Sequence, residues 1–260
     1  MFFILSFILG ASIGSFVQVI ATRLHVAPIT KGRSKCLSCG EALRIPDLIP
    51  VVSCLTLQGR CRYCKSVFGY SSLVIEIIFG LVFLALYYFI LSGQETLLLS
   101  SLYLVYYTVL FGALGVIALY DRAHTYIPIV FLYIFSFLAF VMMGIRYVHE
   151  PSLLILFDPF VVASPFFLVW ILTKGKGVGF GDVLLFLGVG AFFGVSQGIA
   201  VLLVSIWSGA LFGVYVKYFS KNKGKTGIAI PFVPFIVLAF VLVLFLDIDI
   251  FSIASVFPSL

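Results

Sequence analysis

Two aspartates stand at the ends of long uncharged segments, where an ionisable side chain is costly and therefore indicates function. Asp121 follows the uncharged run Leu97–Tyr120, and Asp182 closes the sequence Gly177-Val-Gly179-Phe-Gly181-Asp182 directly before another apolar run. Two carboxylates at close range do not both ionise easily, so such a pair holds one proton. The ionised member can activate water while the protonated member donates a hydrogen bond to a scissile carbonyl. The pair therefore predicts aspartic endopeptidase chemistry.

The same two positions also allow structural roles. Asp182 would serve as an ordinary helix N-cap, and Asp121 would form an ion pair with Arg122 or a lysine. The catalytic hypothesis requires that the two aspartates, 61 positions apart, lie at one membrane depth on neighbouring helices. Gly179 and Gly181 favour it, because glycine allows the close approach of another chain such as a peptide substrate.

Four of the five cysteines form two C-x-x-C pairs separated by 21 residues. The pairs are Cys36 with Cys39 and Cys61 with Cys64. This spacing is typical of two knuckles that present four thiolates to one tetrahedral zinc ion, which would supply the folding energy that a small loop lacks. Disulfides and unligated buried thiols are the alternatives. Cys54 stands alone in an apolar stretch and is expected to be a small buried hydrophobic side chain.

The elements that must position these residues are membrane-spanning helices. The 260-residue chain is 63% hydrophobic and 10% charged, which excludes soluble and disordered proteins. The apolar runs do not alternate with polar residues, so an outer-membrane barrel is excluded as well. We expect an all-α polytopic membrane protein whose spans lie near Met1–Ala21, Leu73–Leu91, Leu97–Tyr120, Ile127–Ile145, Leu153–Leu172, Val183–Val216 and Ile228–Leu246.

The run Val183–Val216 is too long for one span. Its 34 residues would form a helix of about 51 Å, whereas the hydrocarbon core is about 30 Å thick. A break near Gly194–Gly198 would divide the run into two spans, the first of them short. The sequence therefore predicts about eight transmembrane helices.

The distribution of positive charge supports this count. With eight spans, 15 of the 16 basic residues fall on one side of the membrane and only Arg146 lies opposite. Because lysine and arginine in short loops stay in the cytoplasm, both termini are expected outside and both aspartates at the cytoplasmic face. Attraction to anionic lipid headgroups accounts for the net charge of +6 without a nucleic-acid partner.

The predicted topology gives three domains. Residues 1–21 form the first transmembrane helix, residues 22–72 a cytoplasmic zinc-binding module, and residues 73–260 a seven-helix membrane core. Two further acids at membrane depth are expected to be structural. Glu76 would pair with a basic residue of the module, and Asp158 lies toward the outer side.

The order of these motifs closely resembles that of the bacterial type IV prepilin leader peptidases, the peptidase and N-methyltransferase enzymes of type IV pilus, type II secretion and competence systems. Leu184 and Val233 stand where that family commonly has lysine and glycine. The resemblance covers nearly the whole chain and rests on Gly14-Ser15-Phe16 followed by Arg23-Leu24, Ser34-Lys-Cys36-x-x-Cys39, Asp47-x-Ile49-Pro50, Gly59-Arg60-Cys61-Arg62-x-Cys64, Glu76, Asp121-x5-Ile127-Pro128, Gly179-x-Gly181-Asp182 and Ile230-Pro231-Phe232.

The resemblance implies that Asp121 and Asp182 are the catalytic pair of a GxGD-type membrane aspartic protease and that the four paired cysteines bind zinc. It implies prepilins or pseudopilins as substrates, whose short basic leader is cut after glycine at the cytoplasmic edge of the membrane. It also implies S-adenosylmethionine as methyl donor for the new N-terminal residue. The expected location is the bacterial cytoplasmic (inner) membrane.

Three other hypotheses remain open at the level of sequence. A presenilin-like intramembrane protease would use the same aspartates but would not need the large cysteine module. A transporter or channel would bind a cation or proton at Asp121 and Asp182 and would cleave no peptide. A membrane-tethered adaptor built around the zinc module would not need the aspartates at all.

Overall fold

The computed structural model describes residues 2–26, 28, 34–36, 38–67, 70–92, 96–219 and 231–250. They belong to two compact units, Met1–Gly112 and Ala113–Leu260. Part of the predicted charge pattern, the start of the last predicted span, the Ile230 position of the last motif and the C-terminus lie outside the described residues. The basic residues concerned are Lys31, Arg33, Lys221, Lys223 and Lys225.

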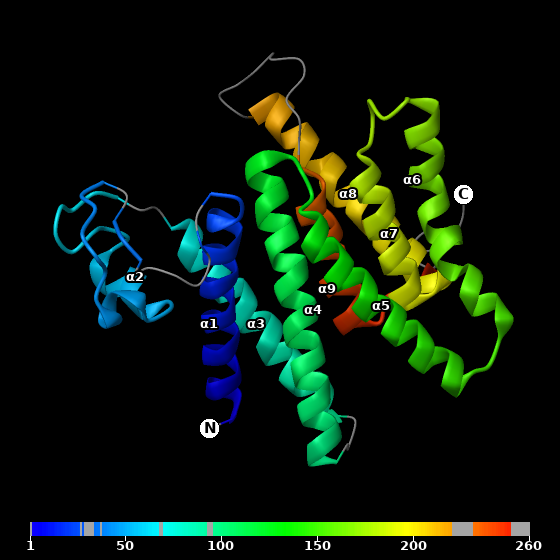
Figure 1. The fold of residues 1–260 in the computed structure, drawn as a ribbon, viewed down its shortest axis with the longest axis horizontal. Helices are drawn as coiled ribbons and strands as arrows, with labels where there is room; N and C mark the ends of the chain where they lie inside the picture. Colours follow the sequence, from blue (N-terminus) through cyan, green and yellow to red (C-terminus); the bar gives the residue numbers. More distant parts are fainter. Residues whose placement is uncertain are drawn as a thin grey trace. The chain divides into compact units, whose positions relative to one another are not determined.

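Two long apolar helices, α1 (Phe2–Arg23) and α3 (Ser71–Ser92), pack against each other in the first unit (Figure 1). Small residues allow the close approach. A Cβ atom on Gly14 would lie 2.9 Å from Phe79, and one on Gly80 would lie 2.5 Å from the ring of Phe7. Such packing is typical of helices in a membrane, where small residues bring backbones together. The first part of α4 (Leu97–His124) completes this unit.

The segment between α1 and α3 contains two knuckles of similar geometry. An isolated antiparallel bridge closes each knuckle, Lys35 with Ala42 and Arg60 with Val67. The turn of the first needs a positive φ at Gly40 (72°), and Lys65 (58°) holds the matching place in the second. Between the knuckles lie a short 3-10 helix, η1 (Ile45–Leu48), and the one-turn helix α2 (Val52–Leu57).

An ion pair ties the second knuckle to η1, which lies between the two knuckles. Arg62, in the second knuckle, donates a hydrogen bond of 2.8 Å from Nε to Oδ1 of the buried Asp47 in η1, and its Nη2 lies 2.7 Å from the same oxygen. The hydrogen bond from Arg62 holds the pKa of the Asp47 carboxyl below its usual range. The pair therefore stabilises a segment that is too small to bury a large apolar core.

The second unit contains the end of α4 and the remaining helices. These are α5 (Ile129–His149), the 3-10 helix η2 (Leu153–Phe157), α6 (Asp158–Leu172), α7 (Phe180–Phe193), α8 (Val195–Phe219) and α9 (Val233–Leu246). Helix α7 contacts α5, α6 and α8, and α9 packs on α8 (Figure 1). Fully buried aromatic rings fill the space between them, including Phe135, Phe186 and Phe240.

The prediction of an all-α polytopic membrane protein is confirmed. Among the described residues, six helices are long and apolar enough to cross a membrane, and α7 and α9 are shorter apolar helices. The predicted break in the long apolar run is also confirmed. Helix α7 ends at Phe193, Gly194 follows with a φ of 83°, and α8 begins at Val195.

Arg146, the basic residue predicted on the side opposite the others, has an acidic partner. Its Nη2 lies 2.7 Å from Oδ2 of Asp158, and Nη1 donates to the carbonyl oxygen of Ala191 at 3.3 Å. A charge at the end of a membrane helix needs such partners. Asp158 thus connects the end of α5 to the start of α6, as the structural role expected for it requires.

Candidate functional site

Asp121 lies in the last turn of α4 and is buried. Its Oδ2 accepts a hydrogen bond of 3.2 Å from the backbone N–H of Val233, the first residue of α9. The amide groups at the start of a helix are free to bind an anion, and the helix dipole favours negative charge there. The start of α9 therefore stabilises the ionised form of this carboxylate.

Asp182 is the third residue of α7, because the helix begins at Phe180 with Gly179 as its N-cap. The helix starts three residues before the predicted span. Asp182 is therefore not the N-cap, and that structural alternative is wrong. Asp121 likewise has no ion pair with Arg122 or a lysine among the described residues, where its partner is the Val233 amide. In the part of the chain that the structure describes, neither carboxylate therefore has the partner that its structural alternative requires.

The two aspartates line the same two adjoining cavities. One cavity of about 480 Å³ lies among α4, α6, α7, α8 and the start of α9, and a second of about 350 Å³ lies toward α5. Both cavities include Asp121, Thr125, Gly179 and Asp182. The two carboxylates thus lie where the two cavities adjoin. From there both can contact a peptide that passes from one cavity to the other.

The glycines beside Asp182 keep this position open. A Cβ atom on Gly179 would lie 3.3 Å from Oδ2 of Asp182, and one on Gly181 would lie 3.0 Å from Cδ1 of Ile127. Contacts as short as 3.0 Å are tighter than most methyl groups tolerate. Side chains at these two positions would crowd the carboxylate and the Ile127 wall of the second cavity.

The four paired cysteines form one cluster in the first unit. The sulfur atoms of Cys36, Cys39, Cys61 and Cys64 all lie within 4.8 Å of one another. Cys36 Sγ and Cys64 Sγ are 3.8 Å apart, which equals the edge of a tetrahedron with metal–sulfur distances of about 2.3 Å. Hydrogen bonding from the Cys39 amide lowers the pKa of the Cys36 thiol to about 6, which favours the thiolate that a metal needs. The cluster can hold a metal ion.

The remaining residues singled out in the sequence lie apart from these clusters. Cys54 is a free, half-buried thiol outside the four-cysteine cluster. Glu76 accepts a 2.7 Å hydrogen bond from the backbone N–H of Val51. Among the described residues no basic side chain pairs with Glu76, and a backbone amide of the cysteine segment takes that place.

Sequence reasoning assigned no role to Val233 or Thr125, which both border the aspartate pair. Pro231 and Pro234 signal the start of a helix, but no sequence pattern indicates which carboxylate would meet that start. Val233 donates the hydrogen bond from its backbone N–H, so the valine that stands here in place of the family's glycine still makes this bond. Leu184 lines the second cavity.

Two family descriptions match this chain. Residues 8–90 match the bacterial peptidase A24 N-terminal domain, and residues 108–214 match the type IV leader peptidase family. The chain belongs to the type IV leader peptidase family. The first match contains the four-cysteine cluster, and the second contains both aspartates.

Two known proteins of this family resemble the chain over most of its length, and a third resembles it over one third. The protein of Vibrio cholerae serotype O1 named prepilin leader peptidase/N-methyltransferase is 24% identical to this chain. The match covers 94% of this chain and 96% of that protein's length. The protein of the same name from Pseudomonas aeruginosa is 26% identical, over 92% of this chain and 88% of its own length. That of Myxococcus xanthus is 35% identical over 33% of this chain and 26% of its own. No solved structure matches the chain.

Proposed function

We propose that this protein is a membrane aspartic endopeptidase that removes the basic leader of type IV prepilins or pseudopilins and then methylates the new N-terminal residue. The single observation that carries the peptidase proposal is that Asp121 and Asp182, from two different helices, line the same pair of adjoining cavities. Membership of the family and the names of its relatives support the same activities.

The surroundings of the two aspartates suggest different roles for them. The Val233 amide stabilises negative charge on Asp121, so Asp121 is the member that takes a proton from the attacking water. Asp182 is the member that carries the shared proton and donates it to the scissile carbonyl oxygen. Asp121 then passes the proton it took from water to the leaving amine, and Asp182 regains its proton from the diol as the C–N bond breaks. No covalent acyl-enzyme is required.

The hollow beside the aspartates suits an extended peptide. The glycines at Gly179 and Gly181 leave room for a backbone next to Asp182, and the apolar walls contributed by Phe166, Ile206 and Phe235 suit the hydrophobic stem of a pilin. A leader with positive charge would stay on the cytoplasmic side, which the distribution of lysine and arginine assigns to the aspartates. Cleavage would then occur where the leader meets the apolar stem.

The cysteine module is proposed to bind one structural zinc ion through Cys36, Cys39, Cys61 and Cys64. Four sulfur atoms at tetrahedral spacing in a segment with few buried apolar side chains support this assignment. Zinc then contributes the folding energy of residues 22–72, the proposed cytoplasmic module between the first helix (1–21) and the peptidase core (73–260).

The proposed setting is the bacterial cytoplasmic membrane. Both termini would lie outside and the aspartates would face the cytoplasm, since 15 of the 16 basic residues fall on one side when eight spans are counted. Lipid and the prepilin are the expected partners, and S-adenosylmethionine is the proposed methyl donor.

One experiment tests both activities. The full-length protein in membranes is incubated with a prepilin and S-adenosylmethionine, and mass spectrometry then identifies the N-terminus of the product. The proposal predicts a shortened pilin with one added methyl group. An intact prepilin would refute the peptidase assignment, and a shortened but unmethylated pilin would refute the methyltransferase assignment alone.

A further inference from the structure

Another cavity, with charged walls, lies in the first unit and shares no lining residue with the two cavities around the aspartates. Its volume is about 290 Å³, and its walls come from α1, α3, η1, α2 and both knuckles. It is lined by carboxylates, guanidinium groups, serine hydroxyls, a thiol and leucines. This volume is just below the usual range of small-molecule pockets, about 300–1,000 Å³.

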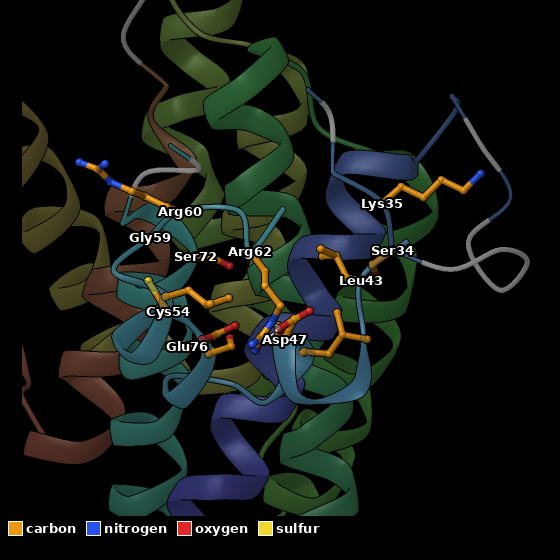
Figure 2. Close-up of a pocket in the computed structure, with 14 residues that line it drawn as sticks. Ser34, Lys35, Leu43, Asp47, Cys54, Gly59, Arg60, Arg62, Ser72 and Glu76 are labelled. Atoms are coloured by element: carbon orange, nitrogen blue, oxygen red, sulfur yellow. Dashed lines mark hydrogen bonds and ion pairs between the residues drawn. The ribbon is translucent and has the colours of Figure 1, made fainter. Parts of the chain in front are cut away.

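The charged groups that meet in this cavity are Glu76 and the Asp47–Arg62 pair (Figure 2). Figure 2 also shows Lys35 and Arg60 extending away from that centre. Arg62 has five N–H donors; Nε donates to Asp47, and Nη2 forms the ion pair with the same carboxylate oxygen. Its other donors are left for an anionic group, such as the α-carboxylate of an amino acid.

Glu76 is a buried acid that neither the peptidase site nor the cysteine cluster uses. It is 5% exposed, and its Oε2 accepts the Val51 amide. Within the described part of the chain this amide is the carboxylate's only hydrogen-bond partner, so Oε1 is left for a ligand. A buried carboxylate at a cavity wall suits a cationic group, because a charge removed from water needs a partner.

We propose that this cavity binds S-adenosylmethionine and is the methyl-transfer site, an inference that rests on the proposed function. The ligand is a zwitterion with an additional sulfonium charge and a ribose diol. Glu76 offers the negative charge that a sulfonium or amine needs, and Arg62 faces the ligand's carboxylate. Ser15, Ser53 and Ser72 offer hydroxyls, and the cavity's leucines offer apolar contact to the adenine ring.

Glu76 also has a role in the chemistry. S-adenosylmethionine supplies an electrophilic methyl group on a positively charged sulfur. The lone pair of the pilin amine forms the new N–C bond while the C–S bond breaks and its electrons return to sulfur. The amine must lose a proton to carry that lone pair, and Oε1 of Glu76 takes it while Oε2 keeps the Val51 amide. The proton then passes to solvent.

Protection of Cys54 gives a readout that does not depend on activity. Cys54 is a free thiol in the cavity wall, so a ligand there should shield it from N-ethylmaleimide. At ten times its Kd, S-adenosylhomocysteine should slow Cys54 alkylation in the full-length protein about tenfold. Peptide mass spectrometry separates Cys54 from the other cysteines, and inorganic phosphate, which cannot supply the cationic group, should give no protection.

Two pairs of variants connect the protection to the cavity. Ser15→Trp fills the cavity from α1 and should abolish protection, whereas Ser12→Trp, at an exposed position of the same helix, should retain it. Glu76→Gln keeps the shape and an acceptor for Val51 but removes the charge, so methylation should fall by about 10²-fold or more. Glu41→Gln in an exposed part of the module should leave methylation unchanged.

The outcomes distinguish this inference from the proposed function. If the wild-type protein cleaves and methylates prepilin but S-adenosylhomocysteine leaves Cys54 alkylation unchanged, the cavity assignment is wrong and the function stands. Equal protection in Ser15→Trp would also overturn it, because the ligand would then bind elsewhere. Protection in the wild type that Ser15→Trp removes supports the site even where prepilin is not cleaved, a result that would count against the peptidase alone.

Discussion

The backbone N–H of Val233 donates a hydrogen bond of 3.2 Å to Oδ2 of Asp121, a residue 112 positions earlier in the chain. The contact brings the start of α9 against the end of α4, whereas the backbone beside the Asp182 carboxylate is that of Gly179, the N-cap of its own helix. An asymmetric environment of this kind is how two chemically identical carboxylates acquire different roles as acid and base.

Replacing either aspartate by asparagine should abolish leader cleavage. Asp121→Asn removes the proposed base and Asp182→Asn the proposed acid, and each loss should lower the cleavage rate about 10³-fold or more. Protein level and metal content should stay near those of the wild type. Prepilin cleavage followed by mass spectrometry measures the effect, and wild-type rates in both variants would refute the pair.

The hydrogen bond from α9 can be removed without changing the carboxylate. Val233 is the first residue of its helix, where proline is tolerated, so Val233→Pro deletes the N–H and leaves the helix in place. A hydrogen bond to a charged group is worth about 1.5–3 kcal/mol, so cleavage should slow about 10- to 100-fold. Val233→Ala retains the N–H and is the control. Equal rates in both variants would show that the amide does not support Asp121.

The rate of leader cleavage should fall when a single methyl group is added beside Asp182. Gly179→Ala places a Cβ atom 3.3 Å from Oδ2 of Asp182 and should slow cleavage about tenfold or more by displacing that carboxylate. Gly112→Ala in α4 meets no atom within 4 Å and should retain the wild-type rate. A Gly179→Ala protein as active as Gly112→Ala would contradict the crowding argument.

Loss of one cysteine ligand should release the metal. Cys36→Ser should lower the zinc content from one ion per chain and make residues 34–67 sensitive to protease, because the metal supplies much of their folding energy. Cys54→Ser, which changes a thiol outside the cluster, should bind zinc normally. Methylation should suffer more than cleavage in Cys36→Ser. Stoichiometric zinc in a variant without all four paired cysteines would show that the ligands lie elsewhere.

The Asp47–Arg62 pair should make the stability of the module depend on pH. Its hydrogen bond lowers the folded-state pKa of Asp47, so the stabilisation is present above the unfolded pKa of about 3.9 and is lost as the pH falls through the lowered folded value. Arg62→Met leaves the Asp47 carboxylate without its cation and should destabilise the module at neutral pH.

Asp47→Asn is the matched control, because it removes the charge and leaves no uncompensated carboxylate. At neutral pH it should be less destabilising than Arg62→Met, and the difference should shrink as acid protonates Asp47 in the Arg62 variant. Hydrogen exchange of residues 43–67 in the full-length protein measures both. An equal effect of the two variants at neutral pH would mean that the pair contributes no net charge stabilisation.

The sequence by itself determined the features that depend on composition and local spacing. Uncharged runs of about 20 residues have one stable solution in a bilayer, so the helices could be predicted. A run too long for one span had to break, and Gly194 provides the positive φ at the break. The C-x-x-C spacing predicted a cluster of Cys36, Cys39, Cys61 and Cys64, since each pair closes within one turn.

Only the tertiary structure decided which groups meet across long distances in the chain. Helices in a membrane present similar apolar faces to many neighbours, so no pattern indicated that α9 would place the Val233 amide on Asp121. The partner of Glu76 and the cavity that Glu76 lines could not be predicted from the sequence either, because both depend on how the module folds back on α3. Local spacing predicts which residues can act, and packing decides which of them face one another.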